Sequence, residues 1–381
     1  MKKLTGGFLV VLAAGLAGAA PIVDVSGVGN RKFTASVNVS NAAFNRSLQK
    51  NLELSGLFTV IPNGSIKVTG APGAVVAEGS GKRLNCPYPF ADDKAARMVA
   101  RQLSDAMVAA YSQGQQKGFA CDPIAFVSRR GKDQTELCMC YPDGFDIRQL
   151  TSRGKQVVGP RWKDANTLFY TGILDVGPQI WEYDVATCQN KLRWSFRGLA
   201  TGACVSPDGR KAAIVLSFQG NPELYVIDLA SSNWTRLTNT PGASEGQPAW
   251  SPDGKKIVYV SDETRHPQLY VLDVATKAKR RLTSKGSQNV DPDWGKDGRI
   301  TYITKRGGAQ VAVMNPAEGE AGVTLVTEPG NWRHPSWSRD ARHVVASRDR
   351  ALFVVDTIEG GDKPRQVFFA NGNWVDPTWS K

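Results

Sequence analysis

The stretch that decides the fold reads Pro248-Ala249-Trp250-Ser251-Pro252-Asp253-Gly254. A tryptophan that follows a proline by two residues and precedes a turn recurs along the chain. The other copies are Pro160-Arg161-Trp162-Lys163-Asp164, Pro292-Asp293-Trp294-Gly295-Lys296-Asp297-Gly298, Pro335-Ser336-Trp337-Ser338-Arg339-Asp340, Pro377-Thr378-Trp379-Ser380 and, lacking both Trp and Pro, Ala203-Cys204-Val205-Ser206-Pro207-Asp208-Gly209. The anchor positions 162, 205, 250, 294, 337 and 379 are separated by 43, 45, 44, 43 and 42 residues. A period near 43 indicates a repeat array.

Three more short runs, rich in β-branched and aromatic residues, recur within each period. After Trp250 they are Ile257 to Val260, Leu269 to Asp273 and Arg281 to Thr283. Together with the anchor-bearing run they make four strands per unit, and the pattern starts at Ile124 and occurs six times. Four short antiparallel strands joined by Asp-Gly turns are typical of a propeller blade, whereas a solenoid would show helices or capping repeats. The sequence therefore predicts a mostly β fold built on a six-bladed β-propeller.

The two ends of the array are incomplete in complementary ways. The first unit lacks an anchor-bearing strand, and the sequence continues for only two residues after Trp379. We therefore expect Pro377 to Ser380 to complete the first blade and close the ring, which removes the inner sheet edge. The tryptophans favour packing between blades over ligand stacking, and the Asp-Gly pairs favour turns over catalytic carboxylates.

Residues 20–118 do not follow the period. Their pattern predicts a small α/β domain ahead of the propeller at 119–381, with strands at Phe33–Val39 and Leu57–Ile61 and helices at Asn41–Leu54 and Asp92–Tyr111. The first helix carries Phe44, Leu48 and Leu52 on one face, and the second repeats apolar residues every four positions from Ala95 to Tyr111.

Residues 1–19 have the features of a cleaved secretory signal peptide. Lys2 and Lys3 precede an apolar run from Phe8 to Leu16, and Ala17-Gly18-Ala19 supplies a cleavage site. The alternative, an uncleaved anchor, is disfavoured because a membrane helix needs about 20 apolar residues. Export places the cysteines in an oxidising compartment. Cys86 with Cys121 is the first disulfide to test, and Cys138 and Cys140 are expected to share one face of a strand.

Composition excludes several classes of protein. The chain has 381 residues, of which 41% are hydrophobic, so it can bury cores and is not a disordered chain. The net charge of +12 is spread along the chain, and no basic run is interleaved with aromatic residues, so we expect no nucleic-acid partner. A solvated basic surface and attraction to an acidic partner both remain open. The cysteines form no C-x-x-C pair and the histidines do not cluster with them, so we expect no metal and no cofactor.

A signal sequence, a small α/β domain and six units of the form P-x-W-S-P-D-G, I-x-Y-V, L-Y-V-x-D and R-x-L-T together resemble the TolB-like family of six-bladed propellers. The run Gly286-Ser287-Gln288-Asn289 and the ending Pro377-Thr378-Trp379-Ser380 are especially similar. The resemblance implies a periplasmic adaptor of the Tol-Pal envelope system, monomeric alone and peripheral to membranes, that supports outer-membrane integrity and constriction at division. Its implied partners are a peptidoglycan-associated lipoprotein (Pal-like) at the propeller and an inner-membrane TolA-like protein at the N-terminal segment.

Two sets of residues are candidates for these contacts. The mature chain is expected to begin at Ala20, and the segment that follows, Pro21-Ile22-Val23-Asp24-Val25-Ser26, is a candidate for the N-terminal contact. It alternates as a strand added to a partner's edge would, or as an ordinary first strand of the α/β domain. In the propeller, we expect the loops entering the inner strands to line one mouth and the Asp-Gly turns to lie on the opposite face. The entry loops carry Arg161, Gln247, Asn289, Asp291, Asn331, Trp332, Arg333, His334, Asn373 and Asp376. We expect the largest contributions from Arg161, Trp332 and Arg333, and solvated loops without a partner are the alternative.

Two enzyme readings compete with a binding protein. Gly242-Ala243-Ser244-Glu245-Gly246 matches the G-x-S-x-G elbow of hydrolases, but a predicted strand follows it where the elbow requires a helix. A hydrolase or lyase acting on glycans or peptides in the propeller channel would need several histidines or carboxylates around one centre. His266, His334 and His343 occupy different positions in the repeat. The sequence therefore predicts a non-enzymatic protein without catalytic residues.

Overall fold

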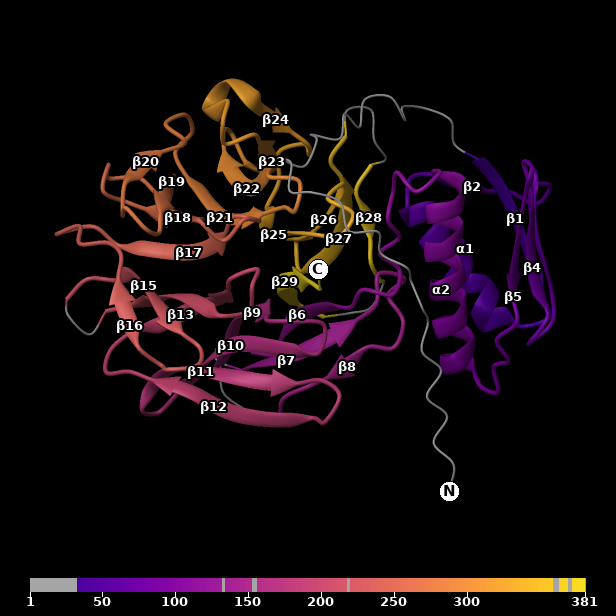
Figure 1. Ribbon diagram of the computed structural model, residues 1–381, viewed down its shortest axis with the longest axis horizontal. Coiled ribbons are helices and arrows are strands. Elements are labelled where there is room, and N and C mark those ends of the chain that lie inside the picture. The colour runs from indigo at the N-terminus through magenta and orange to yellow at the C-terminus, as the bar shows by residue number, and fades with distance from the viewer. Residues whose placement is uncertain are drawn as a thin grey trace. The chain divides into compact units, whose positions relative to one another are not determined.

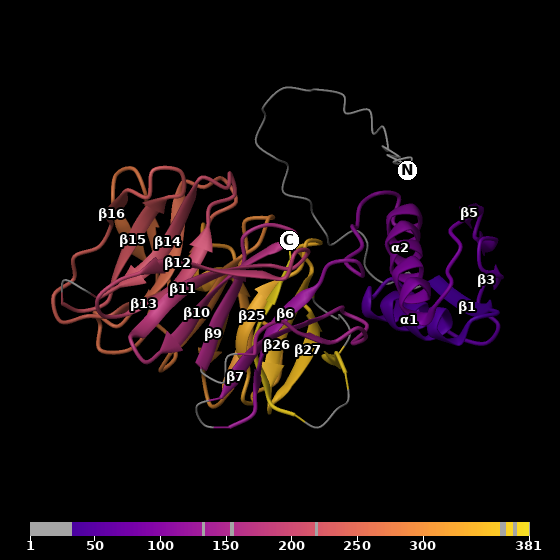
Figure 2. The same cartoon turned by 90° about the horizontal axis from the view of Figure 1, so that it is seen from below.

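The computed structural model describes residues 33–131, 134–152, 156–217, 220–358, 363–368 and 372–380. Within them a small α/β domain precedes six four-stranded sheets (Figures 1 and 2). The predicted fold class, mostly β with a six-bladed propeller behind an α/β domain, is confirmed. The predicted signal peptide at 1–19 and the segment Pro21 to Ser26 lie outside the described residues.

The α/β domain is a five-stranded sheet with two helices on one face (Figure 1). The strand order is β2-β1-β3-β4-β5, with β1 parallel to both of its neighbours. The strands are β1 (Phe33–Val39), β2 (Phe58–Val60), β3 (Ile66–Gly70), β4 (Val75–Gly79) and β5 (Lys82–Cys86). The sequence pattern predicted β1 and β2 and missed β3 to β5.

Both predicted helices are present, and each begins directly after a residue whose side chain caps it. Helix α1 (Ala42–Leu54) begins after Asn41, whose side chain accepts a hydrogen bond from the Phe44 N–H, and α2 (Asp93–Tyr111) begins after Asp92, which does the same for Ala95. The apolar faces of α1 and α2 are buried in a single core with the sheet.

The propeller blades, numbered 1 to 6 around the ring, each contain an inner strand and three further strands. The inner strands of blades 1 to 6 are β29 (Trp374–Trp379), β9 (Gln156–Trp162), β13 (Ala200–Val205), β17 (Glu245–Trp250), β21 (Asn289–Trp294) and β25 (Arg333–Trp337). The second strands are β6 (Ile124–Arg129), β10 (Thr167–Leu174), β14 (Lys211–Leu216), β18 (Lys256–Ser261), β22 (Ile300–Lys305) and β26 (His343–Arg348). The third strands are β7 (Thr135–Cys140), β11 (Gly177–Asp184), β15 (Glu223–Asp228), β19 (Gln268–Asp273), β23 (Ala309–Met314) and β27 (Ala351–Asp356). The outer strands are β8 (Arg148–Gln149), β12 (Gln189–Ser195), β16 (Trp234–Arg236), β20 (Lys279–Arg281), β24 (Val323–Leu325) and β28 (Arg365–Gln366).

The ring closes through the C-terminal strand. β29 pairs antiparallel with β6, with Trp379 opposite Ile124 and Thr378 opposite Ala125. The last strand of the sequence therefore sits in the same sheet as the first strand of the array, which is the closure that the incomplete ends of the array predict.

The anchor tryptophans pack inside the ring. Trp337 and Trp379 are fully buried and Trp250 and Trp294 nearly so. The indole N–H of Trp250 in blade 4 donates to the Cys204 carbonyl (3.0 Å) in blade 3. The indole therefore joins the two blades by a hydrogen bond as well as by its buried contact area. The structural interpretation is confirmed for these four tryptophans, whereas Trp162 is only partly buried and donates to the Thr378 carbonyl at 3.1 Å.

The Asp-Gly pairs form turns. Asp253 accepts hydrogen bonds from the Ser251 hydroxyl (2.6 Å) and the Lys255 N–H (3.0 Å), and Asp208 repeats the first of these contacts with Ser206 (2.5 Å). These bonds lower the carboxyl pKa of Asp253 against the opposing effect of burial. Such carboxylates stabilise a turn and are not poised for proton transfer.

Candidate protein-binding mouth of the propeller

One backbone feature repeats in all six inner strands. The residue three before each anchor position has a left-handed conformation, with φ between 48° and 72°, and the pairing with the second strand shifts register there. These six residues, which we call the channel ring, are Gly159, Gly202, Gln247, Asp291, His334 and Asp376. A bulge of this kind bends the strand and redirects its side chains.

The polar members of the channel ring connect neighbouring blades. The side-chain amide of Gln247 donates to Asp291, and the Asp291 N–H donates back to the Gln247 amide oxygen (2.9 Å). The next N–H along the ring, that of His334, donates to the Asp291 carboxylate (3.0 Å). The Asp376 carboxylate accepts from the Gly159 N–H at 3.4 Å. Each carboxylate or amide thus binds the bulged backbone of the following blade.

His334 lies between two acids of the channel ring. Its Nδ1 is 2.9 Å from Asp376 Oδ1 and its Nε2 is 3.6 Å from Asp291 Oδ1. Burial lowers the pKa of His334, but the two facing carboxylates outweigh burial and raise the pKa to about 9. The imidazole is therefore a cation at neutral pH, and it joins blades 5, 6 and 1 electrostatically.

A second layer of contacts lies just below the channel ring. Asp293 accepts hydrogen bonds from the Trp337 N–H (2.8 Å) and the Ser336 hydroxyl (3.2 Å), and Ser336 in turn accepts from the Trp379 N–H (3.1 Å). These bonds run from blade 5 through blade 6 to blade 1. They hold the inner strands in a fixed register around the channel.

The structure brings only part of the predicted mouth together. Gln247, Asp291, His334 and Asp376 are members of the channel ring, and Asn373 directly precedes β29. Asn331 and Arg333 are exposed at the start of β25, where the Asn331 amide donates to Asp349 (2.9 Å). These seven residues form what we call the entry mouth.

Three predicted mouth residues need correction. Asn289 is completely buried and its amide donates to Gln268 and to the Lys285 carbonyl, both at 2.8 Å, so it fixes a loop. Trp332 is 1% exposed, packs against Phe353 and donates to the Glu328 carbonyl, so it is a core residue and not a contact anchor.

The third correction concerns Arg161. It directly precedes the anchor Trp162, at the far end of its inner strand from the bulge at Gly159, and it lines a cavity of about 710 Å³. The same cavity is lined by Asp208, Gly209 and Pro252 of the Asp-Gly turns. Arg161 therefore lies on the turn side of the channel ring, close enough to His334 for its charge to act on that imidazole.

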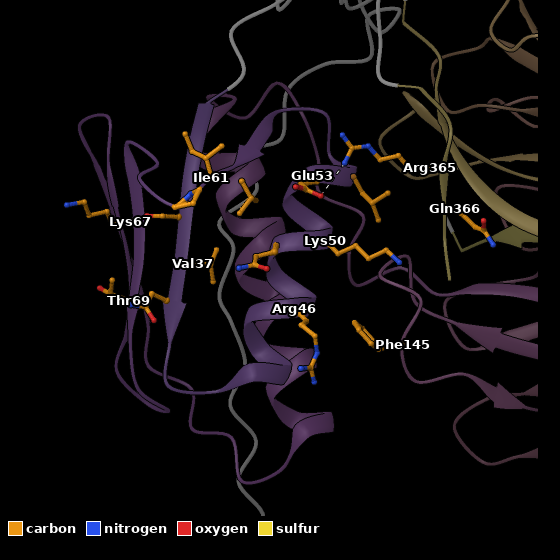
Figure 3. Close-up of a pocket in the computed structure, with 16 residues that line it drawn as sticks. Val37, Arg46, Lys50, Glu53, Ile61, Lys67, Thr69, Phe145, Arg365 and Gln366 are labelled. Atoms are coloured by element: carbon orange, nitrogen blue, oxygen red, sulfur yellow. Dashed lines mark hydrogen bonds and ion pairs between the residues drawn. The ribbon is translucent and has the colours of Figure 1, made fainter. Parts of the chain in front are cut away.

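A second and larger cavity, of about 950 Å³, lies beside helix α1 (Figure 3). Arg46, Lys50 and Glu53 of α1 line it together with strands β1 and β3 and with Arg365 of the propeller. Arg365 forms an ion pair with Glu53 at 3.4 Å, and Lys50 donates to the Val367 carbonyl. Burial lowers the pKa of Lys50, against the opposing effect of Asp143.

A buried ion pair ties α2 to blade 1. Arg101, which is fully buried, donates to both oxygens of Asp143 (2.8 and 3.0 Å) and lies 2.8 Å from Asp146. Its guanidinium also stacks over the Tyr141 ring, 3.9 Å from the ring centre, and Ser47 of α1 donates to Asp143 (2.6 Å). Both helices thus contact the β7–β8 turn. A buried guanidinium that loses its carboxylate partners is strongly destabilising, so Arg101 holds Asp143 and Asp146 of this turn in place.

The other candidate chemistries find little support in the described residues. Ser244 lies in the loop before β17 and donates its N–H to Asp262, with no helix after it, so the G-x-S-x-G match is not an elbow. Among the described residues no group of three or more His, Cys, Asp or Glu is placed to hold a metal ion. No helix in the described part of the chain is both long and apolar enough to cross a membrane.

The expected pairing of Cys86 with Cys121 is wrong, since neither of these two cysteines forms a disulfide in the structure. Cys86 is buried in the core of the α/β domain, whereas the Cys121 N–H donates to Asp105. Cys138 and Cys140 do share one buried face of β7, as the sequence predicted.

Comparisons with known proteins agree with this architecture. The family model of the TolB beta propeller domain matches residues 113–381. The chain belongs to the TolB propeller family. Tol-Pal system protein TolB of Gluconobacter oxydans is 26% identical over 226 residues, which cover 51% of this chain and 49% of that protein. The namesake from Nitratidesulfovibrio vulgaris is 28% identical over 144 residues, covering 37% and 31%. The match thus spans half or less of these TolB proteins.

A solved TolB structure, from Acinetobacter baumannii, superposes with a TM-score of 0.79 at 22% identity and covers 92% of this chain and 97% of its own. A second, described as a putative TolB from Agrobacterium tumefaciens, gives a TM-score of 0.52 at 19% identity over 66% of this chain and 90% of its own. At these identities the likeness to TolB structures concerns the fold.

The glycine members of the channel ring were not among the residues that the sequence predicted. Gly159 and Gly202 occupy the same backbone position as Gln247 and Asp291, three residues before the anchor. Aligning the six anchors and reading that column would have found them, because every member is a glycine or a polar residue.

Proposed function

We propose that this chain is a periplasmic, non-catalytic adaptor of the Tol-Pal system, exported through a cleaved signal peptide and monomeric alone. Membership of the TolB family supports a Tol-Pal role in general. In this proposal the propeller engages a Pal-like lipoprotein, and the segment Pro21 to Ser26 engages an inner-membrane TolA-like protein. The adaptor thereby supports outer-membrane integrity and constriction at division. We keep 20–118 and 119–381 as the proposed domain limits.

The proposal that the propeller binds a Pal-like lipoprotein rests on the channel ring. Its polar side chains are already committed to neighbouring blades, so the rim of the entry mouth is held in place before a partner arrives. Preorganised polar groups lower the entropic cost of binding. Arg333 stands exposed on this rim and has the chemistry of an interface hot spot.

The test is a paired comparison of binding to a purified Pal-like lipoprotein domain by calorimetry. Arg333→Ala should weaken binding by about 1 to 3 kcal/mol if the side chain is central to the interface. Lys255→Ala, beside an Asp-Gly turn on the other face, is the matched control and should bind as the parent does. Both variants should melt at the parent temperature. Loss of binding in the Lys255 variant with an intact Arg333 variant would place the partner on the opposite face.

The enzyme alternative is tested separately with a panel of glycans and peptides, with and without divalent metal. The proposal expects no turnover by the mature chain under either condition. Turnover that the parent catalyses and that is lost on substitution of Asp293 or His334 would replace the adaptor by a hydrolase or lyase working in the channel.

A further inference from the structure

Blade 2 differs from the other five in its outer strand. β12 has seven residues, whereas the outer strands of the other blades have two or three. The two strands inside it are also extended, to eight residues each, against six in every other blade. Figure 1 shows β12 at the outside of its sheet, beyond β11.

A strand at the edge of a sheet has one neighbour and leaves a row of N–H and C=O groups unpaired. β12 pairs with β11 without interruption from Gln189 to Leu192, shifts register at the next residue, and continues at Trp194 and Ser195. The opposite edge of β12 therefore offers a regular backbone template over four residues and two more beyond the bulge. An outer strand of two or three residues offers too little for a stable extra strand.

The side chains of β12 fix the strand to the propeller and leave its edge open. Trp194 packs edge-on against Phe169 (5.4 Å between ring centres), and Arg193 donates to the Leu229 carbonyl of blade 3 (3.0 Å). Leu192 is 48% exposed, and Lys191 is exposed beside it. The contacts of Trp194 and Arg193 thus fix the strand on the propeller, while the apolar side chain of Leu192 remains exposed to solvent.

The positive charge near the free edge of β12 favours an acidic binding partner. Lys191 and Arg197 are exposed, and neither forms an ion pair with any residue in the described ranges. Glu182, which lies opposite Lys191 in the pairing of β11 with β12, is already bound to Lys163 at 2.8 Å and lies 3.8 Å from Arg193. Lys191 is also within electrostatic reach of Asp184. A second copy of β12 would bring the same cations face to face, which is destabilising, whereas an acidic strand would pair with them.

We propose that β12 is a docking edge, which takes up an extended acidic segment of a partner protein as a fifth strand of blade 2. Main-chain hydrogen bonds supply the affinity in this mode, and side chains that alternate along the strand supply the selectivity. The docking edge is independent of the entry mouth and does not rest on the function proposed above.

The first test uses an acetylated heptapeptide of alternating glutamate and valine as the probe for the mature protein. Amide hydrogen exchange should slow by about tenfold or more in β12 at saturating peptide, because its free N–H groups become hydrogen-bonded. A peptide with proline in place of the central valine keeps the charge and loses a ladder donor, so it should bind at least about tenfold more weakly. Equal binding of both peptides, or protection elsewhere on the molecule, would overturn the proposal.

The second test reverses the charge of the edge. Lys191→Glu combined with Arg197→Glu should weaken peptide binding by about tenfold or more at low salt and leave the melting temperature unchanged, because both side chains are exposed. Lys255→Glu with Lys277→Glu makes the same change of net charge on blade 4 and should leave binding intact. If both double variants lose binding equally, the effect depends on net charge and not on the edge. If the protein forms a concentration-dependent dimer in which the β12 amides are protected, the edge binds a second copy of the chain. Either result contradicts the proposal.

Discussion

The channel ring is built in two ways on opposite sides of the same circle. Blades 4, 5, 6 and 1 carry Gln247, Asp291, His334 and Asp376, which we call the polar arc, and blades 2 and 3 carry Gly159 and Gly202, the glycine arc. All six residues have nearly the same left-handed backbone. Glycine adopts it without steric cost, whereas the other residues adopt it at a cost of about 1 kcal/mol or more each.

The difference between the two arcs shows that the polar side chains offset backbone strain by binding the next blade. Residues that strain the backbone persist where surrounding contacts over-determine them, and each member of the polar arc makes an ion pair or hydrogen bond to the next blade. The glycine arc has no side chains at this position, and its blades are joined to their neighbours by other contacts, such as the hydrogen bonds from Arg193 to the Leu229 carbonyl and from Trp250 to the Cys204 carbonyl. The polar arc therefore links blades 4, 5, 6, 1 and 2 through one continuous chain of contacts at the level of the bulges.

The largest effect should come from removing the strand on which the polar arc ends. Deleting Pro377 to Lys381 takes Trp379 out of the core and opens blade 1 next to Asp376. We expect the melting temperature to fall by about 10 °C or more, or cooperative melting to be lost, in calorimetry. Deletion of Lys381 alone is the control. A truncated protein that melts cooperatively at the parent temperature would contradict closure by β29.

The next effect concerns the cation in the polar arc. Because the pKa of His334 is raised to about 9 in the folded chain from an ordinary value near 6.5, its stabilisation is complete below about pH 6.5 and is lost as the pH rises through 9. Urea unfolding should show His334→Gln less stable than the parent by up to about 3 kcal/mol at pH 6, with the difference vanishing near pH 10. His266→Gln, at an exposed position, is the control. A difference that does not change with pH would mean that packing, and not charge, accounts for the role of His334.

A smaller effect should follow from extending the polar arc into the glycine arc. A side chain at Gly159 meets no atom within 4 Å, so the main cost of substitution there is its positive φ. Gly159→Ala should cost about 1 kcal/mol in urea unfolding, whereas Gly159→Asp should cost less, since aspartate tolerates this conformation and can bind a neighbouring N–H. If aspartate proves as destabilising as alanine, side-chain bridging does not offset strain on this side of the ring.

The smallest effect is expected from converting the polar arc to glycine. Gln247→Gly loses the hydrogen bonds to Asp291 but relieves the strained backbone, so the two effects should nearly cancel, to within about 1 kcal/mol. Gln247→Ala keeps the strain, loses the same bonds and should be the less stable of the two variants. The opposite order would show that the backbone at this bulge carries no strain.

The period of the anchor residues made the blades predictable, because five of the six anchors are tryptophans at nearly constant spacing. The polar arc was not predictable in the same way, since its contacts join residues about one repeat apart, or across the closure of the ring, whose types differ from blade to blade. Trp332 and Asn289 were misplaced because a loop position in the sequence says nothing of how deeply the loop packs. The long β12 was also hidden, as its run resembles the other outer strands in composition and differs only in its pairing.

The buried pair of Arg101 with Asp143 has a mechanical consequence. Blade 1 receives the helices through its β7–β8 turn and the C-terminal strand through β6, so both attachments meet in one four-stranded sheet. The other contacts of the α/β domain, from Glu53 to Arg365 and from Lys50 to the Val367 carbonyl, lead to the neighbouring blade 6. The α/β domain is thus attached at the blade that closes the ring, so opening blade 1 would release both attachments at once.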